Sequence, residues 1–188
     1  MATERRRWRV WQRYMDPARF VFLDETGATT NMVRRYGWSP RGARLVDAAP
    51  HGHWRTTTFV AGLRNTGFVA PLVLDGPMTG EIFRAYVQQF LAPALEPGDV
   101  VVMDNLAAHK VAGVREAIEA AGASVMPLPA YSPDLNPIEQ AFAKLKAGLR
   151  KAGARTRDAL WTTIGRLLDT FSPDECSNYL ANSGYASE

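Results

Sequence analysis

The sequence predicts an α/β fold in which a mixed β-sheet carries helices on both faces. Short, continuous apolar runs are typical of strands that are buried on both sides, and the chain has three of them, at 19–25, 99–104 and 123–128. A hairpin pattern occupies 56–75. Helical periodicity fills the gaps before and after the later strands, as expected for parallel strands joined by crossover helices.

The N-terminal part predicts a helix, a strand and a long excursion. Residues 4–14 are basic, with tryptophans on one side of a short helix that ends before Pro17. The first apolar run then forms a buried strand. Residues 26–54 are rich in Gly, Pro and Arg, so we expect a long irregular segment there, with one short strand at 44–48.

The hairpin joins strands 56–64 and 67–75 across Asn65-Thr66. Thr79 is an N-cap residue for the helix that follows. The apolar stripe of that helix repeats at helical spacing and comprises Ile82, Phe83, Tyr86, Val87, Phe90 and Leu91.

The C-terminal half alternates strands and helices. Strand 99–104 precedes a helix with Val111, Val114 and Ile118 on one face, which ends at Gly122. After the third apolar run, a Pro-rich loop leads to further helices at about 137–151, 158–171 and after Ser172-Pro173. This element order matches a ribonuclease H-like fold, and a doubly wound fold is the alternative.

Length and composition indicate one ordinary globular unit. The chain has 188 residues, of which 46% are hydrophobic and 22% charged, which disfavours disorder. Its single cysteine, Cys176, excludes an intrachain disulfide and a cysteine-built zinc site, and fits a reducing, cytoplasmic location. No apolar run approaches the roughly 18 residues of a membrane span, so we expect no membrane association.

Charge is distributed unevenly along the chain. Six basic and two acidic residues lie in 1–20, and six basic residues and one acidic residue lie in 139–157. The intervening segment 21–138 has nine basic and eleven acidic residues, although the formal net charge of the chain is only +3. Two basic segments flanking an acidic core are compatible with a nucleic-acid partner, and solvated surface charge explains them equally well.

Two carboxylates stand at the ends of predicted strands. Asp24 closes the first apolar run and Asp104 closes the second. If these strands are adjacent and parallel, both carboxylates lie at the same sheet edge, where open α/β sheets bind ligands. Hard divalent cations such as Mg²⁺ prefer oxygen ligands and offset carboxylate repulsion. Taken singly, each Asp is also explained as a polar residue that ends a strand.

Glu139 is the third candidate carboxylate. It lies at the start of the helix at 137–151, where Asn136 as N-cap would make Asn136-x-x-Glu139 a capping box. The same face of this helix carries Lys146 and Arg150 further along. An acidic end followed by basic residues fits a metal site next to a polynucleotide, and a solvated helix face gives the same pattern.

Three strings resemble the catalytic blocks of DDE transposases, specifically the mariner-like branch of bacterial insertion sequences. They are FVFLDETG (20–27), VVMDNLAAHK (101–110) and LPAYSPDLNPIEQAFAKLK (128–146). Thirty-four residues separate Asp104 from Glu139, the spacing typical of that branch. The segment RRYGWSPRGARL (34–45) also resembles the family's stretch after the first Asp.

The resemblance implies that Asp24, Asp104 and Glu139 form a metal-binding catalytic triad. Two Mg²⁺ ions, replaceable by Mn²⁺, would support cleavage of DNA at transposon ends and transfer of the 3′-hydroxyl into target DNA. DNA is then the partner, a homodimer is expected, and the bacterial nucleoid is the expected place of action.

Further positions follow from the same resemblance and from charge. Asn105 and His109 follow Asp104 and are candidates for supporting the metal ligands or meeting DNA. Phosphate contacts are expected from the basic side chains nearest to these blocks, namely Lys110, Lys144, Lys146 and Arg150.

The expected organisation has three parts: a basic helical linker remnant at 1–18, the ribonuclease H-like catalytic domain at 19–157, and a helical extension at 158–188. Full-length family members carry an N-terminal helix-turn-helix region, so we expect this chain alone to lack end-specific binding. Two alternatives stay open, a non-catalytic DNA-binding remnant and another ribonuclease H-like nuclease.

Overall fold

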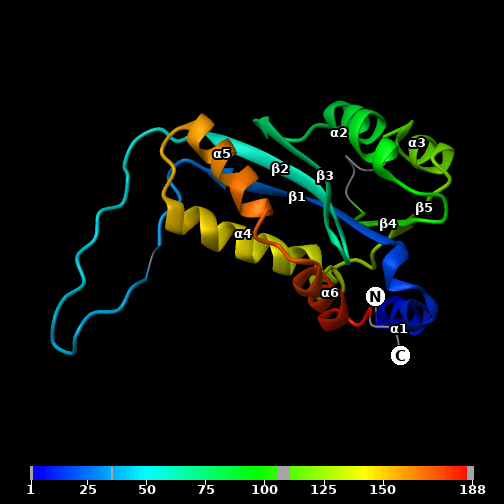
Figure 1. Cartoon of the computed structure of the whole chain (residues 1–188), viewed down its shortest axis with the longest axis horizontal. Coiled ribbons are helices and arrows are strands. Elements are labelled where there is room, and N and C mark those ends of the chain that lie inside the picture. Colours follow the sequence, from blue (N-terminus) through cyan, green and yellow to red (C-terminus); the bar gives the residue numbers. More distant parts are fainter. Residues whose placement is uncertain (1, 35, 106–110, 186–188) are drawn as a thin grey trace.

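A five-stranded mixed sheet forms the centre of the protein in the computed structural model, which describes residues 2–34, 36–105 and 111–185 (Figure 1). The strand order is β3-β2-β1-β4-β5. The strands comprise β1 (Phe20–Thr29), β2 (Thr56–Arg64), β3 (Gly67–Asp75), β4 (Val100–Met103) and β5 (Ser124–Pro127).

The central strand β1 joins the two halves of the sheet. It pairs with β2 antiparallel, from Phe22 opposite Leu63 to Thr29 opposite Thr56. It pairs with β4 in parallel, and β4 pairs with β5 in parallel. The predicted mixed sheet is therefore confirmed, and a purely parallel doubly wound sheet is ruled out.

Side chains of the inner strands alternate between two hydrophobic cores. Phe20 and Phe22 of β1 face one core, together with Phe142. Val21 and Leu23 face the other, together with Phe83. We call these sides the α4 face and the α2 face. This alternation is the period-two geometry of a strand that is covered by helices on both sides.

The helices divide between the two faces as predicted (Figure 1). The α4 face is covered by α1 (Ala2–Trp11), α4 (Ile138–Ala152), α5 (Arg157–Leu168) and α6 (Pro173–Asn182). The α2 face is covered by α2 (Gly80–Tyr86), which continues as a π-helical turn at Val87–Leu91, and by α3 (Val114–Ala120). No described helix has both the length and the apolar content needed to cross a membrane.

Three details differ from the sequence prediction. β1 extends to Thr29, because its long partner β2 continues to supply hydrogen bonds. β5 is an edge strand and only partly buried, with Ser124 and Pro127 exposed, so its apolar run did not mean burial on both faces. Ile82 and Phe90 are exposed, because only the other side of their helix meets the sheet.

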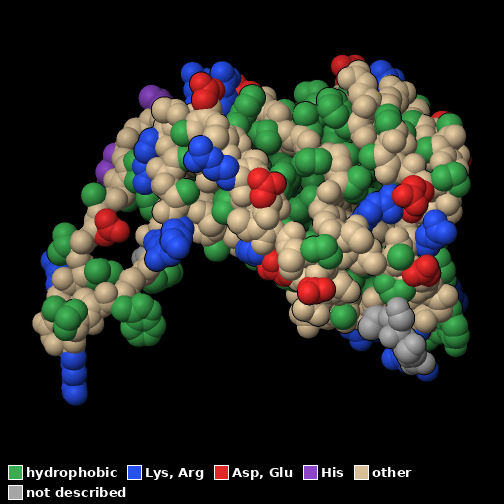
Figure 2. Space-filling model, viewed as in Figure 1, with side chains coloured by type: hydrophobic (Ala, Val, Ile, Leu, Met, Phe, Trp, Pro, Cys, Tyr) green, Lys and Arg blue, Asp and Glu red, His purple; other side chains and the backbone are tan. Residues whose placement is uncertain are grey.

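A long arm leaves the body between β1 and β2 (Figure 1). The described residues of this arm contain no strand, so the expected strand at 44–48 is wrong. Tyr36 and Trp38 are more than nine-tenths exposed, and Figure 2 shows the arm standing away from the rest of the surface. None of the five described strands pairs with 44–48, so this segment lacks the hydrogen-bonding partner that a strand needs.

The N-terminal helix α1 packs on the domain. Trp8 is 7% exposed and belongs to the core of the α4 face. Asp16 caps a 3₁₀ turn at Pro17–Arg19 through a hydrogen bond accepted from the Ala18 N–H. The chain therefore turns directly from α1 into the central strand.

Candidate active site

Asp24 and Asp104 occupy equivalent positions on adjacent parallel strands. Leu23 of β1 lies opposite Met103 of β4, and the two aspartates are the next residues of each chain segment. In β1, alternation puts Asp24 on the same side as Phe22, which is the α4 face. The predicted proximity of the two aspartates in adjacent parallel strands is therefore present, but Asp24 does not close its strand, because β1 continues to Thr29. The same alternation puts Glu25 on the opposite side of β1.

The Asp24 carboxylate is desolvated and hydrogen-bonded at both oxygens. Its Oδ1 accepts the Glu25 N–H at 2.8 Å, and its Oδ2 accepts Nδ2 of Asn136 at 2.9 Å. Burial raises the pKa of Asp24 to about 7, against the lowering effect of the Glu25 hydrogen bond. The negative charges of Glu139, Glu25 and Asp104 raise this pKa further. Burial therefore favours the neutral form of Asp24.

Glu139 comes from the first turn of α4 and is exposed. The negative charge of Glu139 raises the pKa of Asp24, so the helix brings the third predicted carboxylate to the same region. The capping box is wrong: Pro137 is the residue before the helix, and no side chain caps it. The Asn136 side chain hydrogen-bonds Asp24 instead, which removes the structural explanation for the Asn136-x-x-Glu139 pattern.

The three carboxylates suit a hard divalent cation by their chemistry, because all their donor atoms are oxygens. Burial is the main cause of the raised pKa of Asp24, and repulsion from the neighbouring carboxylates adds to it; a cation would offset this repulsion. Within residues 2–34, 36–105 and 111–185, however, no three His, Cys, Asp or Glu side chains are gathered closely enough to hold a metal ion. Coordination by all three would therefore need them to approach one another.

The residues after Asp104 are only partly described. Asn105 is exposed and lines a recess beside Asp104, between the ends of β4 and β5 and the start of α3. The predicted residues His109 and Lys110 lie outside the described part of the chain.

The three predicted basic contacts on α4 separate into two groups. Lys144 is used inside the protein: its Nζ donates to the Thr170 carbonyl at 2.8 Å and contacts Glu175 Oε2 at 2.5 Å. It also lies 4.2 Å from the ring centroid of Phe171. Lys144 therefore ties α4 to the start of α6, which disfavours a phosphate contact. Arg150 is exposed and Lys146 is half-buried.

Sequence reasoning missed the contact between Asn136 and Asp24. These residues are 112 positions apart, and the capping pattern gave Asn136 a sufficient local explanation. The sequence signal that could have pointed to this contact is the position of Asn136, an amide side chain between the Pro-rich loop and the candidate metal ligand Glu139.

The family model described as DDE superfamily endonuclease matches residues 19–161, well over half of the chain. A search of curated proteins found no match. Among solved structures, the Mos1 transposase paired-end complex with left transposon end aligns with a TM-score of 0.74 and 18% identity. That alignment covers 97% of this chain and 57% of the other, so the chain spans little more than half of that protein.

Two further structures show the same likeness. The mariner Mos1 paired end complex with Mg aligns with a TM-score of 0.77 and 18% identity, over 97% of this chain and 57% of the other. The catalytic domain of Mos1 mariner transposase aligns with a TM-score of 0.62 and 16% identity, over 98% of this chain and 95% of that one. The fold is therefore that of a ribonuclease H-like transposase catalytic domain, and the family match shows that the chain belongs to the DDE superfamily endonucleases.

Proposed function

We propose that this chain is the catalytic part of a transposase that cuts DNA at transposon ends and joins the 3′-hydroxyl to target DNA. The observation that carries the proposal is the register of β1 and β4, in which Asp24 and Asp104 directly follow the paired residues Leu23 and Met103. The charge of Glu139, which raises the Asp24 pKa, supports a third member of the site. Solved Mos1 complexes contain transposon-end DNA, which supports DNA as the substrate here.

We propose Asp24, Asp104 and Glu139 as the ligands of divalent cations, Mg²⁺ or Mn²⁺. Bound there, two such ions would activate the attacking oxygen and stabilise the leaving oxygen of an in-line displacement. Mos1 complexes solved with Mg and with Mn support this choice. Asp24 would ionise as a cation binds, releasing its proton from a site where burial otherwise favours the neutral acid.

The chain's other residues would hold the DNA and the carboxylates. Lys146 and Arg150 are the proposed phosphate contacts on α4, on the face that begins with Glu139. Asn105, beside Asp104, is a proposed contact to DNA or to the metal ligands. A homodimer that holds two DNA ends belongs to the same proposal.

The test is cutting of supercoiled plasmid in Mn²⁺, together with joining of an oligonucleotide that carries a 3′-hydroxyl. Asp24→Asn, Asp104→Asn and Glu139→Gln should each reduce both activities to the level seen in EDTA. Glu25→Gln is the matched control, because it neutralises the next residue of β1 on the opposite side, and it should cut. Full activity of Glu139→Gln would remove Glu139 from the site.

The same experiment separates the alternatives. A non-catalytic DNA-binding remnant would bind DNA in a salt-dependent way and leave the plasmid uncut in every metal. Another ribonuclease H-like nuclease would prefer an RNA–DNA hybrid and join no ends. Either result would replace the transposase proposal.

A further inference from the structure

We propose that Asn136 is a positioning residue for Asp24, held in place by a brace from both ends of the chain. The brace comprises Arg5, Trp8, Asp134 and Tyr185. This inference rests on the proposed function, because it assumes that Asp24 must present its carboxylate to a divalent cation.

The amide of Asn136 fixes one side of the Asp24 carboxylate. Asn136 is 5% exposed, and its Nδ2 donates to Asp24 Oδ2 at 2.9 Å. The Glu25 N–H holds Oδ1 at 2.8 Å, so each carboxylate oxygen receives one directed hydrogen bond. A carboxylate can accept about four hydrogen bonds. Each oxygen therefore keeps acceptor capacity for a cation while the group is prevented from rotating.

The other end of the same amide has no partner. Asn136 Oδ1 is buried and accepts no hydrogen bond from the described residues. An ionised carboxylate only accepts, so the amide nitrogen must face Asp24 and the oxygen must point elsewhere. A buried acceptor without a partner destabilises a fold, and an apolar residue of the same shape would not have that effect. Asn136 is thus better explained by what it does to Asp24 than by stability.

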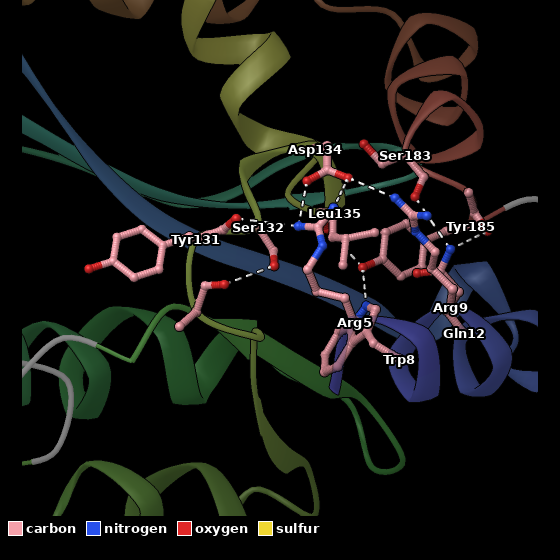
Figure 3. A network of polar contacts seen from close by, with 12 residues as sticks. Arg5, Trp8, Arg9, Gln12, Tyr131, Ser132, Asp134, Leu135, Ser183 and Tyr185 are labelled. Carbon is pink, nitrogen blue, oxygen red and sulfur yellow. Dashed lines mark hydrogen bonds and ion pairs between the residues drawn. The ribbon is translucent and has the colours of Figure 1, made fainter. Parts of the chain in front are cut away.

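The loop before Asn136 is tied to the N-terminal helix by an ion-pair contact (Figure 3). Arg5 Nη1 and Nη2 donate to Asp134 Oδ1 and Oδ2 at 2.9 and 2.8 Å, a bidentate pair. Arg9 Nη2 adds a third contact to Asp134 Oδ2 at 3.2 Å. The hydrogen bond from Arg5 lowers the pKa of Asp134, so this carboxylate stays ionised at neutral pH.

Tyr185, near the C-terminus, holds the residue directly before Asn136. Its hydroxyl donates to the Leu135 carbonyl at 2.8 Å and accepts Nε1 of Trp8 at 2.8 Å (Figure 3). Tyr185 is 1% exposed and Leu135 is 2% exposed, so these bonds are shielded from water. The backbone of the loop is therefore fixed on the N-terminal side of Asn136, and α4 fixes it on the other.

The decisive variants are Asn136→Leu and Asn136→Ala in the full chain. Leu has the branching of Asn at Cγ, with methyl groups in place of the amide oxygen and nitrogen, so it removes both the donor and the unpartnered acceptor. We expect Asn136→Leu to be at least as resistant to urea as the wild type. Its Mn²⁺ affinity, measured by calorimetry without DNA, should fall about 10–100-fold, as for other groups that orient metal ligands. The kcat of plasmid cutting should fall by a similar factor, with the KM for DNA unchanged.

Gln140→Ala is the matched control. Gln140 is a half-buried amide four residues further along the chain, and its Nε2 bonds Ser183 Oγ and the Tyr179 carbonyl, away from Asp24. It should lose stability and keep the wild-type Mn²⁺ affinity and kcat. If Asn136 had a purely structural role, Asn136→Ala would behave like this control: it would lose stability and keep its Mn²⁺ affinity per folded molecule.

The outcomes separate this inference from the proposed function. If the wild type binds Mn²⁺ and cuts DNA, Asp24→Asn does not, and Asn136→Leu behaves as the wild type, the positioning role of Asn136 is overturned and the proposed function stands. If Asp24→Asn itself binds Mn²⁺ and cuts as the wild type does, both are overturned. Weakened Mn²⁺ binding in a stable Asn136→Leu protein supports the inference.

Discussion

Trp8 and Tyr185 join the two ends of the chain through a buried hydrogen bond, 2.8 Å from the indole Nε1 to the phenolic oxygen, across 177 positions of sequence. The Tyr185 ring also lies against Phe20 and Phe22 of β1, with centroid distances of 5.0 and 4.7 Å. The central strand, the N-terminal helix and the C-terminal segment therefore share one packed core. Changes at either end of the chain are expected to reach β1.

Replacing Tyr185 by Phe should destabilise the fold. The variant keeps the ring but leaves the Trp8 N–H and the Leu135 carbonyl without their buried partner, at about 1–3 kcal/mol of unfolding free energy. Urea titration measures the change. Tyr14→Phe is the control, because Tyr14 is 84% exposed and should unfold like the wild type. Equal stability of the two variants would contradict a buried brace at Tyr185.

Replacing Asp134 by Asn should affect cutting more than stability. The Arg5–Asp134 pair is partly exposed, and ion pairs in contact with solvent contribute little to stability. The loop that carries Asn136 would nevertheless lose its bidentate tie to α1, so we expect a severalfold lower kcat for plasmid cutting. Asp75→Asn removes a comparable exposed ion pair with Arg157. Its kcat should stay at the wild-type value, and a matching loss there would rule out a specific effect of the brace.

Basic residues of α4 should divide into structural and DNA-binding groups. Lys144→Ala should lower the urea midpoint, because it removes the contacts to Glu175, Thr170 and the Phe171 ring. Its DNA affinity should barely change. Arg150→Ala should do the opposite, weakening DNA binding and reducing the slope of log affinity against log salt by about one. Fluorescence anisotropy with salt titration tests both, and the reversed pattern would contradict this division.

Ionisation of Asp24 should destabilise the metal-free fold as pH rises. Its pKa is raised to about 7 in the fold, against about 3.9 for an unfolded Asp. The folded state then binds more protons than the unfolded state between these values. The stabilisation of the fold by protonated Asp24 is therefore fully present below about pH 4 and is lost as pH rises through 7.

Asp24→Asn removes this titration, so the comparison isolates it. Measured in EDTA, the variant should gain stability over the wild type between pH 4 and 8, by up to about 4 kcal/mol at the upper end of this range. Titrating groups that do not interact with Asp24 cancel in the difference, which leaves Asp24 and the carboxylates coupled to it. A difference that is flat across this pH range would show that Asp24 ionises normally.

Local sequence patterns predicted most of the sheet and one half of the site. The hairpin at 56–75 is as expected, because alternation and a two-residue turn are decided by neighbouring residues. The proximity of Asp24 and Asp104 was also predicted, because it needs only that their two strands are adjacent and parallel, although β1 runs on to Thr29. Glu139 could be assigned to the start of a helix because the preceding Asn136-Pro137 is a local signal for a helix start.

Long-range contacts could not be predicted in this way. Asn136 carries a local capping pattern, in which its Oδ1 would accept an N–H of the first helical turn. Instead its Nδ2 donates to Asp24, a desolvated carboxylate that needs a hydrogen-bond donor. Lys144 was predicted as a phosphate contact because it lies in a basic run. Only the position of α6 shows that Lys144 forms an ion pair with Glu175. The strand expected at 44–48 failed because strand formation needs a partner, which the arm does not have.

The central claim is that Asp24, Asp104 and Glu139 together hold divalent metal. The most direct measurement is anomalous diffraction from crystals of the chain soaked in Mn²⁺. The account predicts an anomalous peak within about 2–2.3 Å of carboxylate oxygens from all three residues, with Asn136 Nδ2 still bonded to Asp24. A strong peak bound elsewhere, or no peak between these carboxylates at millimolar Mn²⁺, would contradict it.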